Sequence, residues 1–199
     1  MSTAAEQPKR GRLVVISGPS GVGKTTVCET LMRHLPEAML SVSVTTRPPR
    51  VGERDGVDYW FVSPEAFRQR VQRGELLEHA AYSGHQYGTP AGPVHEAIAA
   101  GRHVVLEIEV QGGLQVAKAM PESVRIFILP PSDEALRTRL AGRGTEDPAV
   151  QARRLAAAQR EIELAATPGA YPHQVVNETV AETAEQILGV IQRESESND

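Results

Sequence analysis

Cysteine and lysine are scarce in this chain of 199 residues, which has one Cys, Cys28, and three Lys. A single cysteine excludes an internal disulfide and a multi-cysteine zinc site, and it favours a reducing, cytoplasmic location. No apolar run approaches the roughly 18 residues that cross a bilayer, so we expect no membrane span. The net charge of −4 argues against a nucleic-acid-binding protein. What remains is one globular domain, and its 40% of hydrophobic residues can supply a core.

Arginine stands where lysine is missing, because 18 of the 21 basic residues are Arg. The planar guanidinium grips phosphate or carboxylate through two hydrogen bonds, whereas the Lys ammonium is a compact point charge. Composition leaves two explanations open: a GC-rich genome, which the many Ala and Gly residues favour, and a need to bind phosphate. Position along the chain has to separate them.

Short apolar runs rich in β-branched residues alternate with segments of helical periodicity. We predict buried strands at 13–16, 103–108, 124–129 and 174–176. We predict helices at 25–35, 64–74, 91–100, 114–119, 147–166 and 179–192, and one that begins at 132–134 and ends at 142–144. This alternation predicts an α/β fold with a mostly parallel, doubly wound sheet.

The segment 41–90 interrupts this rhythm, because it is polar and rich in turn residues. Short strands are expected there at 41–46, at 58–62 and around Tyr82 and Tyr87. We interpret the segment as an inserted subdomain. The N-terminal arm 1–10 and the tail 194–199 are expected to be disordered.

The firmest motif is Gly18-Pro19-Ser20-Gly21-Val22-Gly23-Lys24-Thr25, which matches G-x-x-x-x-G-K-[ST] between a predicted strand and a predicted helix. Glycines let successive backbone N–H groups turn toward a bound anion, and the helix N-terminus adds partial positive charge. Lys24 can reach the β- and γ-phosphates, and the Thr25 hydroxyl can bind Mg²⁺. The motif therefore predicts binding of ATP or GTP.

A second basic loop suggests an acceptor that is itself a phosphate. In Thr45-Thr46-Arg47-Pro48-Pro49-Arg50 two guanidiniums lie three residues apart on a segment stiffened by proline. Such a loop can clamp one phosphate, with Tyr59 adding a hydroxyl donor. Read on its own, the same loop also fits a solvated charged surface.

Five ordered motifs together resemble the guanylate kinase family: GPSGVGKTT (18–26), SVSVTTRPPRVGERDGVDYWFV (41–62), ELLEHAAYSGHQYGT (75–89), EIEVQG (107–112) and LAGRGTEDPAVQARRLAAAQRE (140–161). The resemblance implies a P-loop kinase fold with an inserted GMP-binding subdomain and a helical lid. It also implies reversible, Mg²⁺-dependent phosphoryl transfer from ATP to GMP in purine nucleotide metabolism. In this interpretation the core comprises 11–40, 91–138 and 167–193, the GMP-binding subdomain 41–90, and the lid 139–166.

The resemblance also implies roles for individual residues. ATP would be bound by Gly18, Pro19, Ser20, Gly21, Val22, Gly23, Lys24, Thr25, Thr26 and Asn177, with Asn177 near the donor base and Thr25 at the metal. GMP would be bound by Ser43, Arg47, Arg50, Tyr59, Glu78, Tyr87, Thr89, Glu107 and Glu109. Catalysis would fall to Lys24, Arg47, Arg139, Arg143 and Arg154, the last three from the lid.

Glu78 fits guanine on chemical grounds as well. The Watson–Crick edge of guanine presents N1–H and N2–H₂ side by side, and one carboxylate accepts from both. Adenine has a lone pair at N1, which the carboxylate would repel. Taken alone, Glu78 also fits an ordinary surface carboxylate, and the Ser43 and Thr89 hydroxyls fit local backbone partners.

One position departs from the family pattern. After the third core strand the family usually has an acidic residue, one intervening residue and then an Asp, and this acidic pair lies near Mg²⁺ and the GMP phosphate. This chain has Glu107-Ile108-Glu109 instead, and the extra methylene moves the second carboxylate by more than a bond length. An alternative for Glu109 is a hydrogen bond to backbone at the end of the sheet.

Two other functions stay open. One is a related P-loop kinase that acts on another phosphorylated ribose. The other is a non-catalytic guanylate-kinase-like module that binds phosphopeptides, against which the complete phosphate loop and lid arginines argue. The six histidines have no H-x-x-x-H spacing, so we expect neither a metal site nor a general base from them. The expected partners are ATP and GMP, and the expected state is a monomer or a weak homo-oligomer.

Overall fold

Two β-sheets organise the computed structural model, which describes residues 11–141 and 148–196. The main sheet is parallel and has the strand order β2-β7-β1-β8-β9. Its strands are β1 (Leu13–Ser17), β2 (Met39–Leu40), β7 (Val104–Glu107), β8 (Val124–Leu129) and β9 (His173–Val176). The prediction of an α/β fold with a mostly parallel sheet is therefore confirmed.

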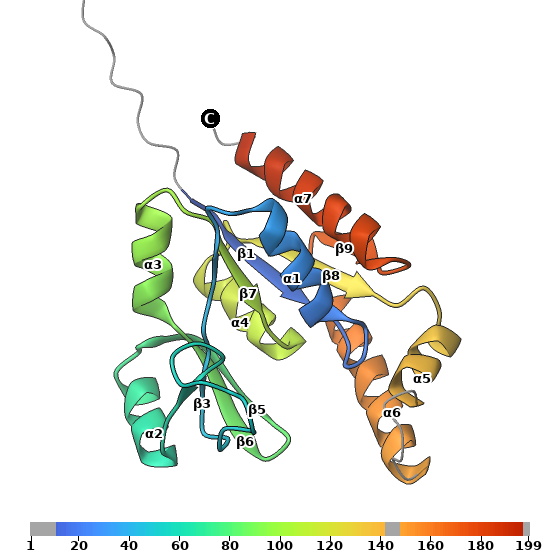
Figure 1. Ribbon diagram of the computed structural model, residues 1–199, viewed down its shortest axis with the longest axis horizontal. Helices are drawn as coiled ribbons and strands as arrows, with labels where there is room; N and C mark the ends of the chain where they lie inside the picture. The colour runs from blue at the N-terminus through green and yellow to red at the C-terminus, as the bar shows by residue number, and fades with distance from the viewer. Residues whose placement is uncertain (1–10, 142–147, 197–199) are drawn as a thin grey trace, which may run out of the picture.

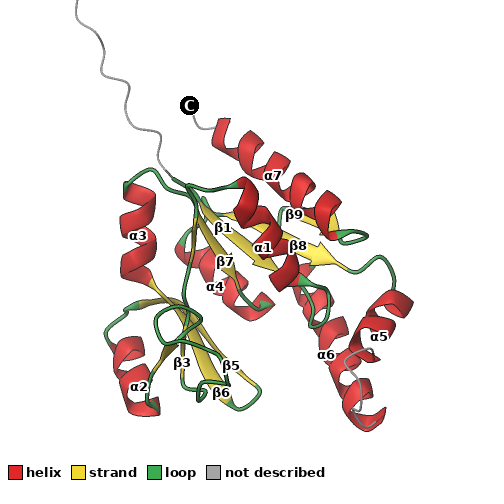
Figure 2. Ribbon diagram, viewed as in Figure 1, coloured by secondary structure: helices red, strands yellow, loops and turns green. Residues whose placement is uncertain are grey.

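Helices cover both faces of this sheet (Figures 1 and 2). One face is covered by α1 (Lys24–His34) and α7 (Val180–Glu196). The other is covered by α3 (Ala91–Ala99), α4 (Val110–Ala119) and the end of α6 (Pro148–Ala165). Within the described ranges, no helix combines the length and apolar character needed to cross a bilayer.

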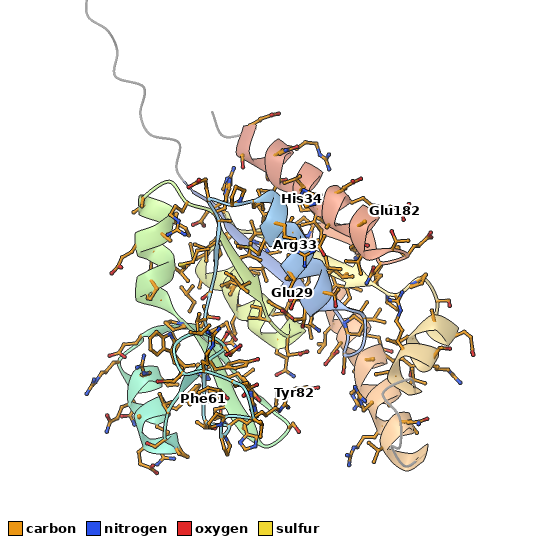
Figure 3. All side chains as sticks on the ribbon, in the orientation of Figure 1. Glu29, Arg33, His34, Phe61, Tyr82 and Glu182 are labelled. Carbon is orange, nitrogen blue, oxygen red and sulfur yellow. The ribbon has the colours of Figure 1, made fainter. Side chains whose placement is uncertain are left out.

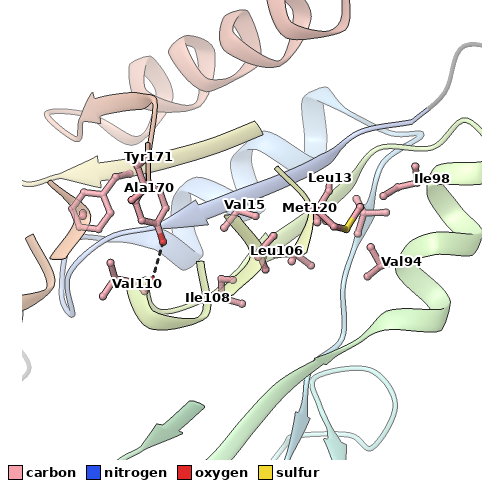
Figure 4. Close-up of a cluster of buried hydrophobic side chains, with 14 of the residues drawn as sticks. Leu13, Val15, Val94, Ile98, Leu106, Ile108, Val110, Met120, Ala170 and Tyr171 are labelled. Atoms are coloured by element: carbon pink, nitrogen blue, oxygen red, sulfur yellow. Dashed lines mark hydrogen bonds between the residues drawn. The ribbon is translucent and has the colours of Figure 1, made fainter. Parts of the chain in front are cut away.

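The central strand β1 is buried along its whole length because its sequence, LVVIS, is apolar toward both faces. Val14 and Ile16 pack toward α1 and α7. Leu13 and Val15 point the opposite way, into the cluster drawn in Figure 4. The carboxyl ends of β1 and β7 therefore lie on a rigid support, and the loops that follow them are held close together.

A second sheet lies entirely within the segment 41–90. It has the order β4-β3-β6-β5 and consists of β3 (Val44–Thr45), β4 (Trp60–Phe61), β5 (Leu76–Tyr82) and β6 (His85–Pro90), with α2 (Pro64–Gln72) beside it. Figure 1 shows this lobe below the main sheet and apart from α5 (Asp133–Ala141) and α6. The strands predicted at 41–46 and 58–62 are each only two residues long in the structure.

Helix α4 begins at Val110, four residues before its predicted start. Gly112 and Gly113 hid that start from the sequence, because glycine is unfavourable inside a helix. A Cβ on Gly112 would overlap Glu78 Oε2, and a Cβ on Gly113 would overlap the hydroxyl of Tyr171. Close packing against this helix therefore explains both glycines.

Helix α7 continues to Glu196, so residues 194–196 are helical and their prediction as part of a disordered tail was wrong. Side chains from elsewhere in the fold hold its last turn. Arg12 donates to the carbonyl of Glu194, and His173 Nε2 lies 3.1 Å from Glu194 Oε1. Residues 1–10 and 197–199 lie outside the described residues.

Candidate active site

The phosphate loop connects β1 to α1, as the motif predicted. Gly21 and Gly23 have positive φ angles, 83° and 99°, which the turn requires and which glycine adopts without strain. The N-cap residue of α1 is Gly23, which has no side chain to cap the helix. Lys24 Nζ donates to the carbonyl of Gly18 at 2.5 Å and lies 3.9 Å from Glu109 Oε1. The loop therefore presents backbone donors and one ammonium group on a rigid support.

Thr25 and Glu107 meet at the edge of this loop. The Thr25 hydroxyl donates to Glu107 Oε1 at 2.7 Å, which joins the first turn of α1 to the end of β7. Both groups are hard oxygen donors, the kind that Mg²⁺ prefers alongside substrate phosphates and water. The pair therefore fits a magnesium site better than a site for a softer metal.

A cavity of about 520 Å³ lies between the phosphate loop and the second sheet. Its size suits a nucleotide-sized ligand. Glu29 on α1 and Tyr82 on β5, both labelled in Figure 3, line it from the two lobes. Ten of the residues singled out from the sequence also line it: Lys24, Thr25, Ser43, Arg47, Arg50, Tyr59, Glu78, Tyr87, Glu107 and Glu109.

Arg47 is held in this cavity by Glu53. Its Nη2 lies 2.8 Å from Glu53 Oε1 and its Nη1 2.9 Å from Glu53 Oε2, a bidentate pair. Glu53 Oε2 also accepts from the backbone N–H of Arg50 at 2.8 Å. The Arg47 guanidinium lies over the ring of Tyr59, 5.3 Å from its centroid, and Tyr87 meets Tyr59 edge-on. Only 9% of Arg47 is exposed, so its direction is set before any ligand binds.

Glu78 is the buried carboxylate of the cavity, with 5% of the residue exposed. It is opposite Thr89 in the β5–β6 pair, and the Thr89 hydroxyl donates to Glu78 Oε1 at 2.7 Å. Burial raises the pKa of Glu78 to about 7, and the Thr89 hydrogen bond opposes that shift. The site thus holds a carboxylate that has lost much of its hydration and needs donors from a ligand.

Neither Arg139 nor Arg154, the two predicted lid arginines that the structure describes, lines the cavity. Arg139 of α5 donates to the carbonyls of Val22 at 3.1 Å and Asn177 at 2.9 Å. The Asn177 side chain also donates to the Val22 carbonyl, at 2.7 Å. Arg154 of α6 lies 3.4 Å from Ser20 Oγ. Arg143 lies outside the described residues.

Glu53 and Glu161 are carboxylates of the site with defined partners that were not singled out from the sequence. Glu53 follows Arg50 by three residues, and only the fold shows that it pairs with Arg47. Glu161 of α6 accepts a hydrogen bond from the backbone N–H of Ser20 at 3.1 Å. A carboxylate three residues after an arginine in a tight loop is a weak signal that sequence reasoning can use for Glu53, whereas we find no comparable local signal for Glu161.

Comparison with known proteins agrees with this geometry. The family model described as guanylate kinase matches residues 10–194. The chain is 51% identical over 186 residues to a protein named guanylate kinase from Thermobifida fusca, with 94% of this chain and 92% of that protein covered. It is 49% identical over 188 residues to one from Listeria monocytogenes, with 94% and 90% covered.

A solved structure agrees as well. The crystal structure of guanylate kinase from Anaplasma phagocytophilum matches with a TM-score of 0.76 and 35% identity, covering 94% of this chain and 87% of that one. The phosphate loop, the second sheet and the cavity between them thus occur in a chain that is similar to these proteins over nearly its whole length. The chain belongs to the guanylate kinase family.

Proposed function

We propose that this chain transfers the γ-phosphoryl group of ATP to GMP and releases ADP and GDP, in a reversible reaction of purine nucleotide metabolism. Family membership supports the reaction class. The proposal that GMP is the acceptor rests on Glu78, a buried carboxylate in a cavity that reaches the phosphate loop. The reaction brings two phosphates together, so catalysis depends on neutralising their charge and on positioning them.

The donor phosphates are proposed to bind the amides of residues 18–26 and the N-terminus of α1. Lys24 would exchange its bond to the Gly18 carbonyl for phosphate oxygens, because an ammonium–phosphate contact is charge-assisted. Asn177 and Arg139, which flank Val22, are proposed to border the donor base. This assignment moves Arg139 from the transferring phosphates to the base side.

Mg²⁺ is proposed to bind beside Thr25. When bound, it would neutralise charge on the phosphates. Glu107 accepts a hydrogen bond from the Thr25 hydroxyl, which leaves the lone pairs of the hydroxyl oxygen free for the metal. Glu109 lines the cavity beside Lys24 and is proposed to border the acceptor phosphate.

The GMP phosphate is proposed to lie against Arg47 and Arg50, with a hydroxyl donated by Tyr59. Arg47 is already fixed by Glu53 and by the ring of Tyr59, so little side-chain entropy is lost on binding. No general base is required, because the attacking phosphate oxygen is already anionic. Cancelling the repulsion between the two phosphates is the main task of these cations.

Guanine is proposed to bind with N1–H and N2–H₂ donating to Glu78. Thr89 occupies one lone pair of Glu78 Oε1 and orients the carboxylate. Ser43 and Tyr87 line the same cavity and are proposed to complete the base site. An adenine in this pocket would leave a buried carboxylate facing a lone pair, a mismatch that costs binding.

The moving parts are proposed to follow the domain division predicted from the sequence. Segment 41–90 would close over GMP, and the lid 139–166 would bring Arg143 and Arg154 to the phosphates. Closure matters because water in an open site would accept the phosphoryl group. Since every proposed contact comes from one chain, a monomer or weak homo-oligomer suffices, and the single cysteine favours the cytoplasm.

Neither alternative function gains support from a specific observation. A phosphopeptide-binding module has no use for Lys24 and Thr25 in a complete phosphate loop. A kinase of another phosphorylated ribose has no use for a buried carboxylate in a base site.

A coupled assay of ADP release tests the proposal, with ATP, Mg²⁺ and a panel of GMP, dGMP, AMP, CMP, UMP and IMP. We expect GMP to be the preferred acceptor. Lys24→Ala should abolish transfer and leave the melting temperature close to that of the wild type, because Lys24 contacts only loop carbonyls and one partly exposed carboxylate. Absence of transfer to every acceptor, or full activity of Lys24→Ala, would contradict the proposal.

A further inference from the structure

Glu161 of α6 lies against the phosphate loop, and the mechanism proposed above gives it no task. Its Oε2 accepts from the Ser20 backbone N–H at 3.1 Å. Seven residues earlier, two turns along the same face of the helix, Arg154 Nη2 lies 3.4 Å from Ser20 Oγ. Helix α6 therefore contacts both the backbone and the side chain of Ser20 in the phosphate loop.

Apolar packing continues this contact along the loop. Ala158 of α6 is fully buried with Leu136 and Leu140 of α5. A Cβ on Gly21 would come within 2.7 Å of Leu140 Cδ2, so the loop packs against α5, which packs in turn against α6. Glu161 is thus the polar end of an interface between the loop and helices α5 and α6.

Glu161 also faces Glu109. Glu109 Oε2 is buried and has no hydrogen-bond partner among the residues that the structure describes. The Glu161 carboxyl lies within hydrogen-bonding reach of the Glu109 carboxyl group, with Lys24 nearby. A proton on Glu161 can be donated to Glu109 while the other Glu161 oxygen accepts from Ser20. Burial, and then the charge of Glu109, raises the pKa of Glu161 and favours this protonated form.

We propose that Glu161 is a positioning residue, which joins Ser20 to Glu109 through one carboxyl and so fixes the phosphate loop relative to the helix that carries Arg154. The inference rests on the proposed function for its consequence, since the loop and Arg154 are taken to bind ATP. The role needs an acceptor and a donor at set positions and needs no negative charge. A glutamine in this place supplies both, through its amide oxygen and its NH₂ group.

Three variants and one control separate position from charge. Glu161→Gln keeps the acceptor and the donor, Glu161→Asp keeps an ionisable carboxyl group but draws it back from Ser20, and Glu161→Ala removes both acceptor and donor. Glu163→Gln is the control, because Glu163 is exposed on the same helix. Each protein is first melted to establish that it folds. Affinity for a fluorescent ATP analogue is then titrated, and kcat and both KM values are measured.

Glu161→Ala and Glu161→Asp are expected to weaken binding of the ATP analogue about tenfold, the effect of one lost hydrogen bond, and to lower kcat. The KM for GMP should change less than the affinity for ATP, because Glu109 is the one proposed GMP contact that Glu161 reaches, and Glu109 keeps its contact with Lys24. Glu161→Gln should stay within about threefold of the wild type in every constant, and Glu163→Gln should match the wild type. A residue that acted only on stability would lower the melting temperature and leave these constants unchanged.

The inference is wrong if Glu161→Asp is active and Glu161→Gln is not, since charge would then be what matters. It is also wrong if Glu161→Ala binds ATP as well as the wild type or more tightly, since Glu161 would then be idle or compete with phosphate. Should Glu161→Ala fail to fold, the Gln and Asp variants decide. A wild type that binds the ATP analogue but leaves GMP unphosphorylated contradicts the proposed function, and the binding titrations still test Glu161.

Discussion

Arg47 and Glu53 show how single residues prepare the proposed acceptor site. Their bidentate pair, with oxygen–nitrogen distances of 2.8 and 2.9 Å, holds the guanidinium in one direction. The same carboxylate raises the pKa of Arg47, and Arg47 in turn lowers the pKa of Glu53, so both groups stay ionised at neutral pH. A side chain held in advance loses less entropy when phosphate arrives.

Removal of Glu53 should therefore weaken GMP binding although Glu53 carries the same sign of charge as the substrate. For Glu53→Ala we expect the KM for GMP to rise about fivefold to twentyfold, as one charged hydrogen-bonded partner is lost. The KM for ATP should change little. Glu65→Ala, which breaks the exposed pair with Arg68 on α2, is the matched control and should behave as the wild type. An unchanged or lower KM for GMP in Glu53→Ala would show that the pair does not orient Arg47.

The pKa of Glu78 makes a prediction about pH. Burial raises this pKa to about 7 in the empty site. Below pH 7 the protonated carboxyl offers only one good acceptor and adds a donor, whereas guanine needs two acceptors. The KM for GMP should therefore rise as the pH falls from 8 to 6, with the KM for ATP less affected. A KM for GMP that is constant over this range, measured with saturating ATP, would argue against Glu78 as the guanine acceptor.

At the scale of elements, α4 limits where the carboxylate of Glu78, the proposed guanine acceptor, can lie. Gly112 in its first turn leaves no room for a Cβ beside Glu78 Oε2. The neighbouring Gly113 leaves room for the Tyr171 hydroxyl, which is hydrogen-bonded with the Ser17 hydroxyl at 2.8 Å and donates to the Val110 carbonyl at 3.3 Å. Figure 4 shows the second of these bonds. The backbone of α4 is thus in direct contact with Glu78 at Gly112 and with Tyr171 at Gly113.

Gly112→Ala tests this fit. The added methyl group must displace Glu78 or α4, so we expect the KM for GMP to rise at least fivefold and the protein to lose about 1–3 kcal/mol of stability. Gly92→Ala in α3 is the control, because a Cβ there meets nothing within 4 Å and alanine favours a helix. Unfolding in urea and the two KM values are the measurements. A Gly112→Ala variant with wild-type KM for GMP would show that Glu78 is placed by other contacts.

For the whole molecule, the sequence predicted what depends on local pattern. The three central strands, the phosphate loop and its helix, and the break in rhythm at 41–90 follow from apolar runs, glycine spacing and turn residues. The start of α4 was missed because two glycines there serve contacts with Glu78 and Tyr171, which are distant in sequence. The role of Glu161 was missed because its partner Ser20 is also distant in sequence. The direction of Arg139 likewise depends on distant partners, the carbonyls of Val22 and Asn177.

The arginine excess can also be divided at this scale. Arg47 and Arg50 line the cavity, and Arg139 and Arg154 lie at the phosphate loop. Arg125 is buried too, but it donates to backbone carbonyls and to Ser123, so its task is structural. Nucleotide binding is thus proposed for a minority of the arginines, and composition bias is the simplest explanation for the others.

The central claim is that Glu78 selects guanine as the acceptor base for phosphoryl transfer from ATP. The most direct test is the ratio of kcat/KM for GMP to kcat/KM for AMP, measured for the wild type, Glu78→Gln and the exposed control Glu75→Gln. We predict a large ratio for the wild type and the control. In Glu78→Gln the kcat/KM for GMP should fall by an amount equivalent to about 1–3 kcal/mol of transition-state binding, so the ratio of GMP to AMP should collapse. A ratio that is the same in Glu78→Gln as in the wild type would contradict the account.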